Sequence, residues 1–124
     1  TARSKSRDAR RVADIKQIQL ALKLYFDATV GGTANYPNVL SVLAPTYIPG
    51  VPGDPLGGAY NYACSGTTYH LAAALEENTN PALNTDRDAP VNTICATDPI
   101  NGADAAGGAN CSGTGTRYCY DVTP

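Results

Sequence analysis

Apolar side chains recur every three or four positions over the first 28 residues, and this spacing predicts one long amphipathic helix. No Gly or Pro interrupts residues 3–28, and the pair Gly31–Gly32 then provides a stop signal. At 1.5 Å per residue this helix spans about 39 Å, longer than a domain of this size needs for its own core. Its first two turns carry almost nothing apolar, so we expect the start of the helix to need a partner or a continuation. The apolar stripe consists of Val12, Ile15, Ile18, Leu22 and Phe26.

Residues 59–75 alternate between apolar and other side chains, which predicts a β-hairpin. Ser65, Gly66 and Thr67 supply the turn. One face of the hairpin is expected to close over the apolar stripe of the helix. The side chains on that face are Tyr60, Tyr62, Cys64, Tyr69, Leu71, Ala73 and Leu75.

The rest of the chain is poorer in regular patterns. Residues 39–43 predict one or two helical turns, and four prolines then make residues 45–58 irregular and extended. Residues 76–116 are mostly small and polar, an irregular excursion with one short strand near Ile94, and residues 117–122 read as a final strand. We therefore predict a single α+β domain over 1–124: helix 1–28, connecting loop 29–58, hairpin 59–75, and C-terminal loop region with the last strand, 76–124.

Composition adds that the core is thin. Only 22 of the 124 residues are Leu, Ile, Val or Phe, and the net charge is −2. A small folded domain of this kind usually needs additional stabilisation, such as disulfide bonds. No segment approaches the roughly 20 apolar residues that a membrane-spanning helix requires.

Four cysteines could supply this stabilisation: Cys64, Cys95, Cys111 and Cys119. Because there is no C-x-x-C pair and only one His, a zinc site is poorly supported. An even count in a chain of this composition is typical of disulfides in an exported protein. Three pairings exist, and we favour Cys111–Cys119 with Cys64–Cys95, worth roughly 2.5 and 3.7 kcal/mol by loop-closure entropy. The alternative is four reduced, buried thiols.

Charge is unevenly distributed along the chain. Residues 1–28 carry seven basic and three acidic side chains, whereas residues 29–124 carry two basic and eight acidic. A basic start indicates nucleic acid, an acidic membrane surface or an acidic neighbour, and the simplest alternative is a solvated helix face. Nucleic acid is disfavoured because no aromatic side chains are interleaved to stack on bases. The basic patch consists of Arg3, Lys5, Arg7, Arg10 and Arg11.

Catalysis is not predicted. The only His, His70, lies in an expected strand, and no nucleophile or phosphate-binding motif is present. No cofactor is expected, with one exception. Asp86 and Asp88 lie one residue apart in a loop, and irregular loops with carboxylates suit Ca²⁺, although the EF-hand pattern is missing. The alternative is solvated loop acids.

The order of these features resembles that of a known family. A basic segment leads into DIKQIQLALKLYFD, then a Tyr36–Pro37 turn, then a P-x-D-P-x-G stretch at Pro52, Asp54, Pro55 and Gly57, and then a tyrosine-rich strand. This order is similar to that of the bacterial type IV pilins and type II secretion pseudopilins, nearest to the major pseudopilin. The resemblance covers residues 2–75. The cysteine-rich segment 76–116 is more typical of true pilins.

The resemblance implies a structural subunit of an extracellular or periplasmic filament. It also implies that a very hydrophobic half-helix precedes Thr1, anchors the precursor in the inner membrane and later joins many copies into a fibre. The partners would be further copies of the chain and a pilus or secretion assembly machinery. The apolar stripe of the helix would then be buried partly under the chain's own sheet and partly against neighbouring copies. Type IV pilus, secretion pseudopilus and DNA-uptake filament are all compatible with it. A secreted, disulfide-stabilised binding module is the alternative from another class, and an exported enzyme is a third.

Overall fold

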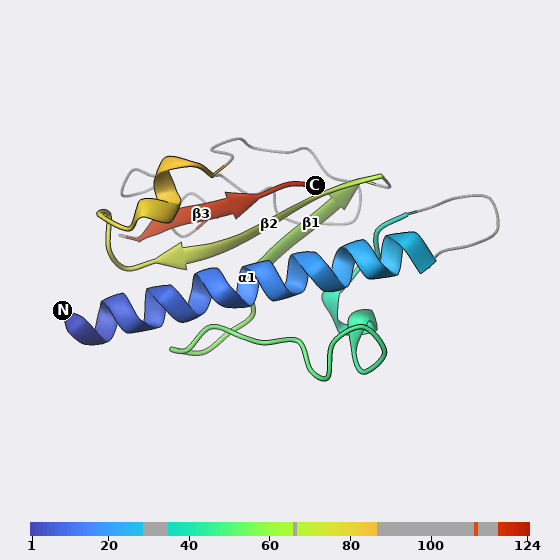
Figure 1. Cartoon of the computed structure of the whole chain (residues 1–124), viewed down its shortest axis with the longest axis horizontal. Helices are drawn as coiled ribbons and strands as arrows, with labels where there is room; N and C mark the ends of the chain where they lie inside the picture. The colour runs from blue at the N-terminus through green and yellow to red at the C-terminus, as the bar shows by residue number, and fades with distance from the viewer. Residues whose placement is uncertain (29–34, 66, 87–110, 112–116) are drawn as a thin grey trace.

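The computed structural model describes residues 1–28, 35–65, 67–86, 111 and 117–124. In these parts the long helix α1 lies along one face of a three-stranded sheet and runs the length of the molecule (Figure 1). This confirms the predicted α+β architecture of one long N-terminal helix and a small antiparallel sheet. In chain order the elements are α1 (Ala2–Ala28), the 3₁₀ helix η1 (Leu40–Leu43), β1 (Asn61–Ser65), β2 (Thr68–Leu75), the 3₁₀ helix η2 (Pro81–Asn84) and β3 (Tyr118–Val122).

The strands are ordered β1-β2-β3, and both pairings are antiparallel. Leu71 in the central strand lies opposite Tyr62 of β1 and Val122 of β3. A slip of one residue would turn Leu71 away from the helix, so burial of this face specifies the register. The hairpin lies where the alternation predicted it, and β3 lies within the predicted last strand, residues 117–122.

The main core lies between α1 and the sheet. Ile15, Ile18 and Leu22 of the helix are fully buried there, whereas Val12 and Phe26, at the two ends of the predicted stripe, are only partly buried. The other large buried side chains of this core are Leu43, Ile48, Tyr60, Tyr69, Leu71, Leu75, Leu83 and Tyr120.

Aromatic rings cover the last turns of α1. The ring of Tyr36 lies 4.6 Å from that of Phe26 and 4.7 Å from that of Tyr69. Tyr25 meets Tyr47 edge to face, with 5.6 Å between the ring centroids. Offset and edge-to-face pairs of this kind stabilise the fold beyond the burial of their apolar area. They therefore help to hold the C-terminal half of α1 against the rest of the protein.

The opposite face of the sheet carries small side chains. Ala63, Ala72, Cys111 and Cys119 form a second buried cluster there. Cys111 and Cys119 are joined by a disulfide, as predicted. The other predicted bond involves Cys95, which lies outside the described residues, so that pairing stays a prediction. The predicted strand near Ile94 lies outside them as well.

The connection between η1 and β1 is irregular, as its prolines predicted, but it contains one well-defined turn. Asp54 N–H donates to the Gly58 carbonyl and Gly57 N–H donates to the Asp54 carbonyl, each over 2.9 Å. Gly57 and Gly58 have φ values of 109° and 87°, a region that favours glycine. The turn therefore holds the Asp54 side chain in a defined direction.

The helix η2 was not expected. Asn80 accepts a hydrogen bond from Ala82 N–H through its side chain, and Pro81 follows directly. A capping Asn followed by Pro is a recognised signal for the start of a helix. Residues 76–116 were expected to be irregular apart from one short strand near Ile94, so that local signal was overlooked.

Candidate functional site

The five basic residues near the start of α1 do not form one surface patch, which corrects the sequence-based expectation. Arg3, Lys5 and Arg10 are exposed, whereas Arg7 is half-buried and Arg11 is 0% exposed. The physical reason is helical spacing. Positions 7 and 11 are four residues apart, share a face, and turn toward the end of the sheet.

Arg11 is the centre of a buried ion-pair network. Its guanidinium grips Asp54 through two hydrogen bonds, from Nε to Oδ2 over 2.8 Å and from Nη2 to Oδ1 over 3.0 Å. A planar guanidinium matches a carboxylate in this two-bond arrangement, which gives the contact a fixed geometry. The turn at Asp54 is thereby tied to the helix.

The remaining nitrogen of Arg11 joins two further carboxylates. Nη1 donates to Asp8 Oδ1 over 2.8 Å and to Glu76 Oε2 over 2.7 Å. Arg7 grips the same Glu76 through two bonds of 2.7 and 2.8 Å. We call Asp8, Arg11, Asp54 and Glu76 the ion-pair seat, with Arg7 at its rim.

The seat also binds backbone groups at the end of β2. The fully buried carboxylate of Asp8 accepts hydrogen bonds from the N–H groups of Glu76 and Glu77, at 2.9 to 3.1 Å. Arg117, just before β3, donates to the Ala74 carbonyl and lies 3.4 Å from Asp54 Oδ2. One cluster of charges therefore joins the helix, the loop before β1 and the ends of two strands.

Hydrogen bonds between opposite charges shift the pKa values of Arg11, Asp54 and Glu76 in the seat. Hydrogen bonds from Arg7 are the main reason that the pKa of Glu76 is lowered, to about 2. Burial alone would lower the pKa of Arg11, but its hydrogen bonds to Asp54, Glu76 and Asp8 outweigh burial and raise it. Burial would raise the pKa of Asp54, and the hydrogen bond with Arg11 reverses this. General acid–base catalysis needs a pKa near the working pH, so these groups are suited to holding structure.

No protein-family model, curated protein or solved structure matches this chain.

A second polar contact lies one turn further along α1. Asp14 is buried and accepts a hydrogen bond of 2.7 Å from the Tyr60 hydroxyl. Burial and this bond raise the pKa of Tyr60 well above its ordinary value. The contact links the helix to the residue just before β1, so it extends the seat toward the apolar core.

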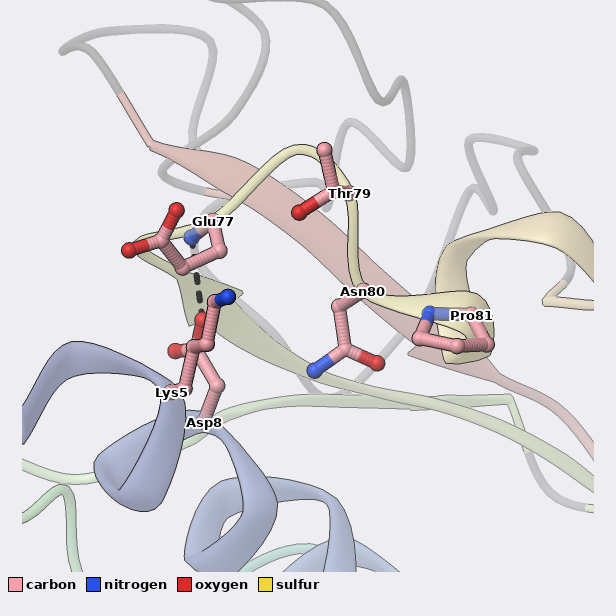
Figure 2. Close-up of a pocket in the computed structure, with 6 residues that line it drawn as sticks. All are labelled: Lys5, Asp8, Glu77, Thr79, Asn80 and Pro81. Carbon is pink, nitrogen blue, oxygen red and sulfur yellow. Dashed lines mark hydrogen bonds between the residues drawn. The ribbon is translucent and has the colours of Figure 1, made fainter. Parts of the chain in front are cut away.

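A shallow groove of about 300 Å³ lies beside the seat (Figure 2). Lys5 and Asp8 rise from α1 on one side, and Thr79, Asn80 and Pro81 line the other side, before and within η2. The Asn80 side-chain oxygen is already occupied by Ala82 N–H, and Asp8 by the backbone of β2. These acceptor oxygens of the groove are thus already used within the protein.

His70 lies on the face of the sheet opposite α1. Its Nε2 is 2.6 Å from Asp121 Oδ2, and both side chains are fully buried. The sequence placed His70 in a strand and predicted no catalytic role for it, and the buried pair with Asp121 was not foreseen. The two residues are 51 positions apart, and only the pairing of β2 with β3 brings them together.

The calcium site expected at Asp86 and Asp88 stays a prediction. Asp86 Oδ2 accepts a hydrogen bond of 3.2 Å from Asp121 N–H, and Asp88 lies outside the described residues. Within the described ranges, no group of three or more His, Cys, Asp or Glu side chains could hold a metal ion. In the same part of the chain, no helix is both long and apolar enough to cross a membrane.

The middle residues of the predicted apolar stripe are buried, but the inward face of α1 begins earlier in the sequence than the stripe did. Asp8 and Arg11 precede Ile15 at the same spacing of three and four, so they lie on the same inward face. Extending the stripe through polar positions would have placed the seat on the buried side. The exposed large apolar residues of α1 are Leu20 and Leu24, and neither belongs to the apolar stripe predicted from the sequence.

Proposed function

We propose that this chain is the outward-facing part of a subunit of a type IV pilin-like filament, with a structural and not a catalytic role. The observation that carries the proposal is the form of α1: 27 helical residues laid along one face of a small antiparallel sheet. The order of sequence features that resembles the pilins and pseudopilins supports the same function. We expect it at a bacterial cell surface or in the periplasm.

The ion-pair seat gives a physical reason for so long a helix. The apolar core engages α1 mainly through Ile15, Ile18 and Leu22, whereas the first turns are held by charged groups at the end of β2. Directional contacts at the first turns, added to the aliphatic contacts further along, keep the helix from pivoting on the sheet. A filament subunit needs such a fixed angle, because small errors of orientation accumulate along a fibre.

Assembly would follow from contacts between different surfaces of identical copies. Head-to-tail contacts that do not close into a ring generate a helical fibre. Because Ile15, Ile18 and Leu22 are fully buried within one subunit, they serve the subunit's own core. Further copies would meet other surfaces, together with the hydrophobic half-helix that the resemblance implies before Thr1.

Immunogold electron microscopy of cells that make the protein tests this proposal. Antibody raised against residues 1–124 is expected to decorate filaments, and a strain lacking the gene is the control. Labelled surface fibres would indicate a pilus or a DNA-uptake filament. Short periplasmic fibres that appear on overexpression would indicate a secretion pseudopilus. Label confined to unassembled protein in the medium would contradict the proposal and favour a secreted binding module.

A further inference from the structure

The outward face of α1 carries a continuous exposed stripe. Lys5, Ala9, Ala13, Lys16, Leu20 and Leu24 are all exposed, and they follow one another at steps of three or four residues. Positions at this spacing lie on one face of a helix, so the six side chains form a line over about five turns. We call them the outer stripe. Figure 1 shows that α1 runs along the whole molecule, with the sheet on one side and the connection between η1 and β1 on the other.

The basic residues of the outer stripe have no ion-pair partner in the described part of the chain. Lys16 and Lys5 make no ion pair with any described carboxylate, and neither does Arg3 nearby. Lys23 beside them pairs only with the exposed Asp27, over 3.4 Å. The face is therefore positively charged toward the solvent.

The carboxylates of the described residues are already engaged inside the chain. Asp8, Asp54 and Glu76 belong to the seat, while Asp14 accepts from Tyr60 and Asp27 pairs with Lys23. Among the others, Glu77 accepts from Ser4, Asp121 contacts His70, and Asp86 accepts from the backbone of Asp121. The described surface of a second copy thus offers no unpaired acidic cluster to this face. The complementary negative charge belongs to something other than that surface.

The stripe combines this charge with exposed apolar side chains. Leu20 is 61% exposed and Leu24 is 46% exposed, one turn apart, with Lys16 one turn before and Lys23 beside them. Ala9 and Ala13, earlier in the stripe, have small side chains that protrude little from the helix. The two leucines thus lie at the C-terminal end of the stripe, with basic side chains before and beside them. A helix that lies in a membrane interface likewise combines apolar side chains that enter the boundary with long basic side chains that reach the headgroups.

We propose that the outer stripe docks α1 flat on an anionic lipid surface. Leu20 and Leu24 enter the headgroup boundary, and the lysines of the stripe meet lipid phosphates. The proposal stands on the surface of the chain alone and does not depend on filament formation. It describes an interfacial helix and not a spanning one.

Nucleic acid is the other polyanion that a basic helix face could meet, and it accounts for less of the surface. Phosphate contacts would use the lysines but would leave Leu20 and Leu24 exposed to water. The outer stripe also has no aromatic side chain that could stack on a base. A lipid surface uses both components of the stripe.

Vesicle co-sedimentation with the whole chain tests the charge component. Phosphatidylglycerol vesicles are expected to bind the protein and phosphatidylcholine vesicles are not. Each basic residue near an anionic leaflet contributes about fivefold in affinity, so K5Q/K16Q is expected to bind roughly 25-fold more weakly. Raising the salt concentration is expected to weaken binding further. Equal binding of wild type and K5Q/K16Q would overturn the proposal.

Fluorescence tests the apolar component with a matched pair. The chain has no Trp, so Leu20→Trp introduces a single reporter on the stripe. Leu56→Trp is the control, since Leu56 is 60% exposed and lies on the turn whose Asp54 is tied to the inward-facing Arg11. Phosphatidylglycerol vesicles are expected to shift the emission of the Leu20 variant to the blue and to leave that of the Leu56 variant unchanged. Equal shifts, no shift, or a K5Q/K16Q effect seen with duplex DNA but not with vesicles would each overturn the proposal.

Discussion

Residues 4–14 of α1 meet the rest of the protein mainly through polar and charged side chains, whereas residues 15–22 meet it mainly through aliphatic ones. In the first region the buried side chains are Ser4, Asp8, Arg11 and Asp14, and in the second they are Ile15, Ile18, Ala21 and Leu22. Both regions belong to one uninterrupted helix and face the same way. The same inward face is therefore held by two different kinds of interaction.

The difference separates stability from orientation. Aliphatic burial is non-directional and scales with the apolar area removed from water. The bonds of the seat require defined distances and angles, and the cost of removing charges from water offsets much of their attraction. We infer that the aliphatic half supplies most of the net free energy of folding, and that the seat sets the angle at which α1 lies on the sheet.

Removing the central cation should have the largest effect. Arg11→Met keeps a long, apolar side chain but leaves the carboxylates of Asp8 and Asp54 without their main partner. Removing one member of a buried ion pair typically costs 3–5 kcal/mol, so we expect a loss of about 4 kcal/mol in the free energy of unfolding. Urea denaturation followed by circular dichroism measures it.

Arg3→Met is the matched control for that variant, because Arg3 is exposed and makes no ion pair with a described residue. We expect a change within about 0.5 kcal/mol, as for most surface substitutions. Equal losses in the two variants would mean that the seat does not exist in solution as described. Replacing Asp54 by Asn in the Arg11→Met background should restore part of the loss, because one uncompensated charge is removed.

Truncation in the aliphatic half should have a somewhat smaller effect. Leu22 is fully buried in the main core, and Leu22→Ala should cost about 3 kcal/mol through lost transfer free energy and the cavity left behind. Unlike Arg11→Met, this variant should keep the wild-type dependence of stability on pH. Denaturation midpoints at pH 7 and pH 3 give both quantities, and a changed pH dependence would argue against independent regions.

Acid should weaken the seat selectively. The pKa of Glu76 is lowered to about 2, and the pKa of Asp54 is lowered as well. A carboxylate whose folded pKa lies below its unfolded value of about 4 stabilises the protein above that unfolded value. The contribution is lost as the pH falls through the folded pKa. Stability should therefore decline between about pH 5 and pH 2, and Glu76→Gln should make the decline shallower. An unchanged slope in Glu76→Gln would contradict the proposed role of Glu76.

The sequence predicted the elements better than the seat. The helix and the hairpin were found because their signal is local, a repeat of about 3.6 in one and of 2 in the other. The bond between Arg11 and Asp54 joins positions 43 apart, and it forms only once the turn before β1 folds back on the helix. A charged residue on the inward face looks like a solvated one until its partners are known. The same limit hid the pair of His70 and Asp121.

The smallest effect on the free energy of unfolding is expected at Leu20, which lies two residues before Leu22 but on the outward side of α1. Leu20 and Leu22 are the same residue in the same helix, but Leu20 is 61% exposed and Leu22 is buried. Leu20→Ala should change the free energy of unfolding by no more than about 0.5 kcal/mol, because little apolar surface leaves water at that site when the chain folds. Urea denaturation at two protein concentrations measures it. A loss above about 1 kcal/mol that grows with protein concentration would show that copies of the chain cover Leu20 in solution. In that case the outward face of α1 would also contribute to stability.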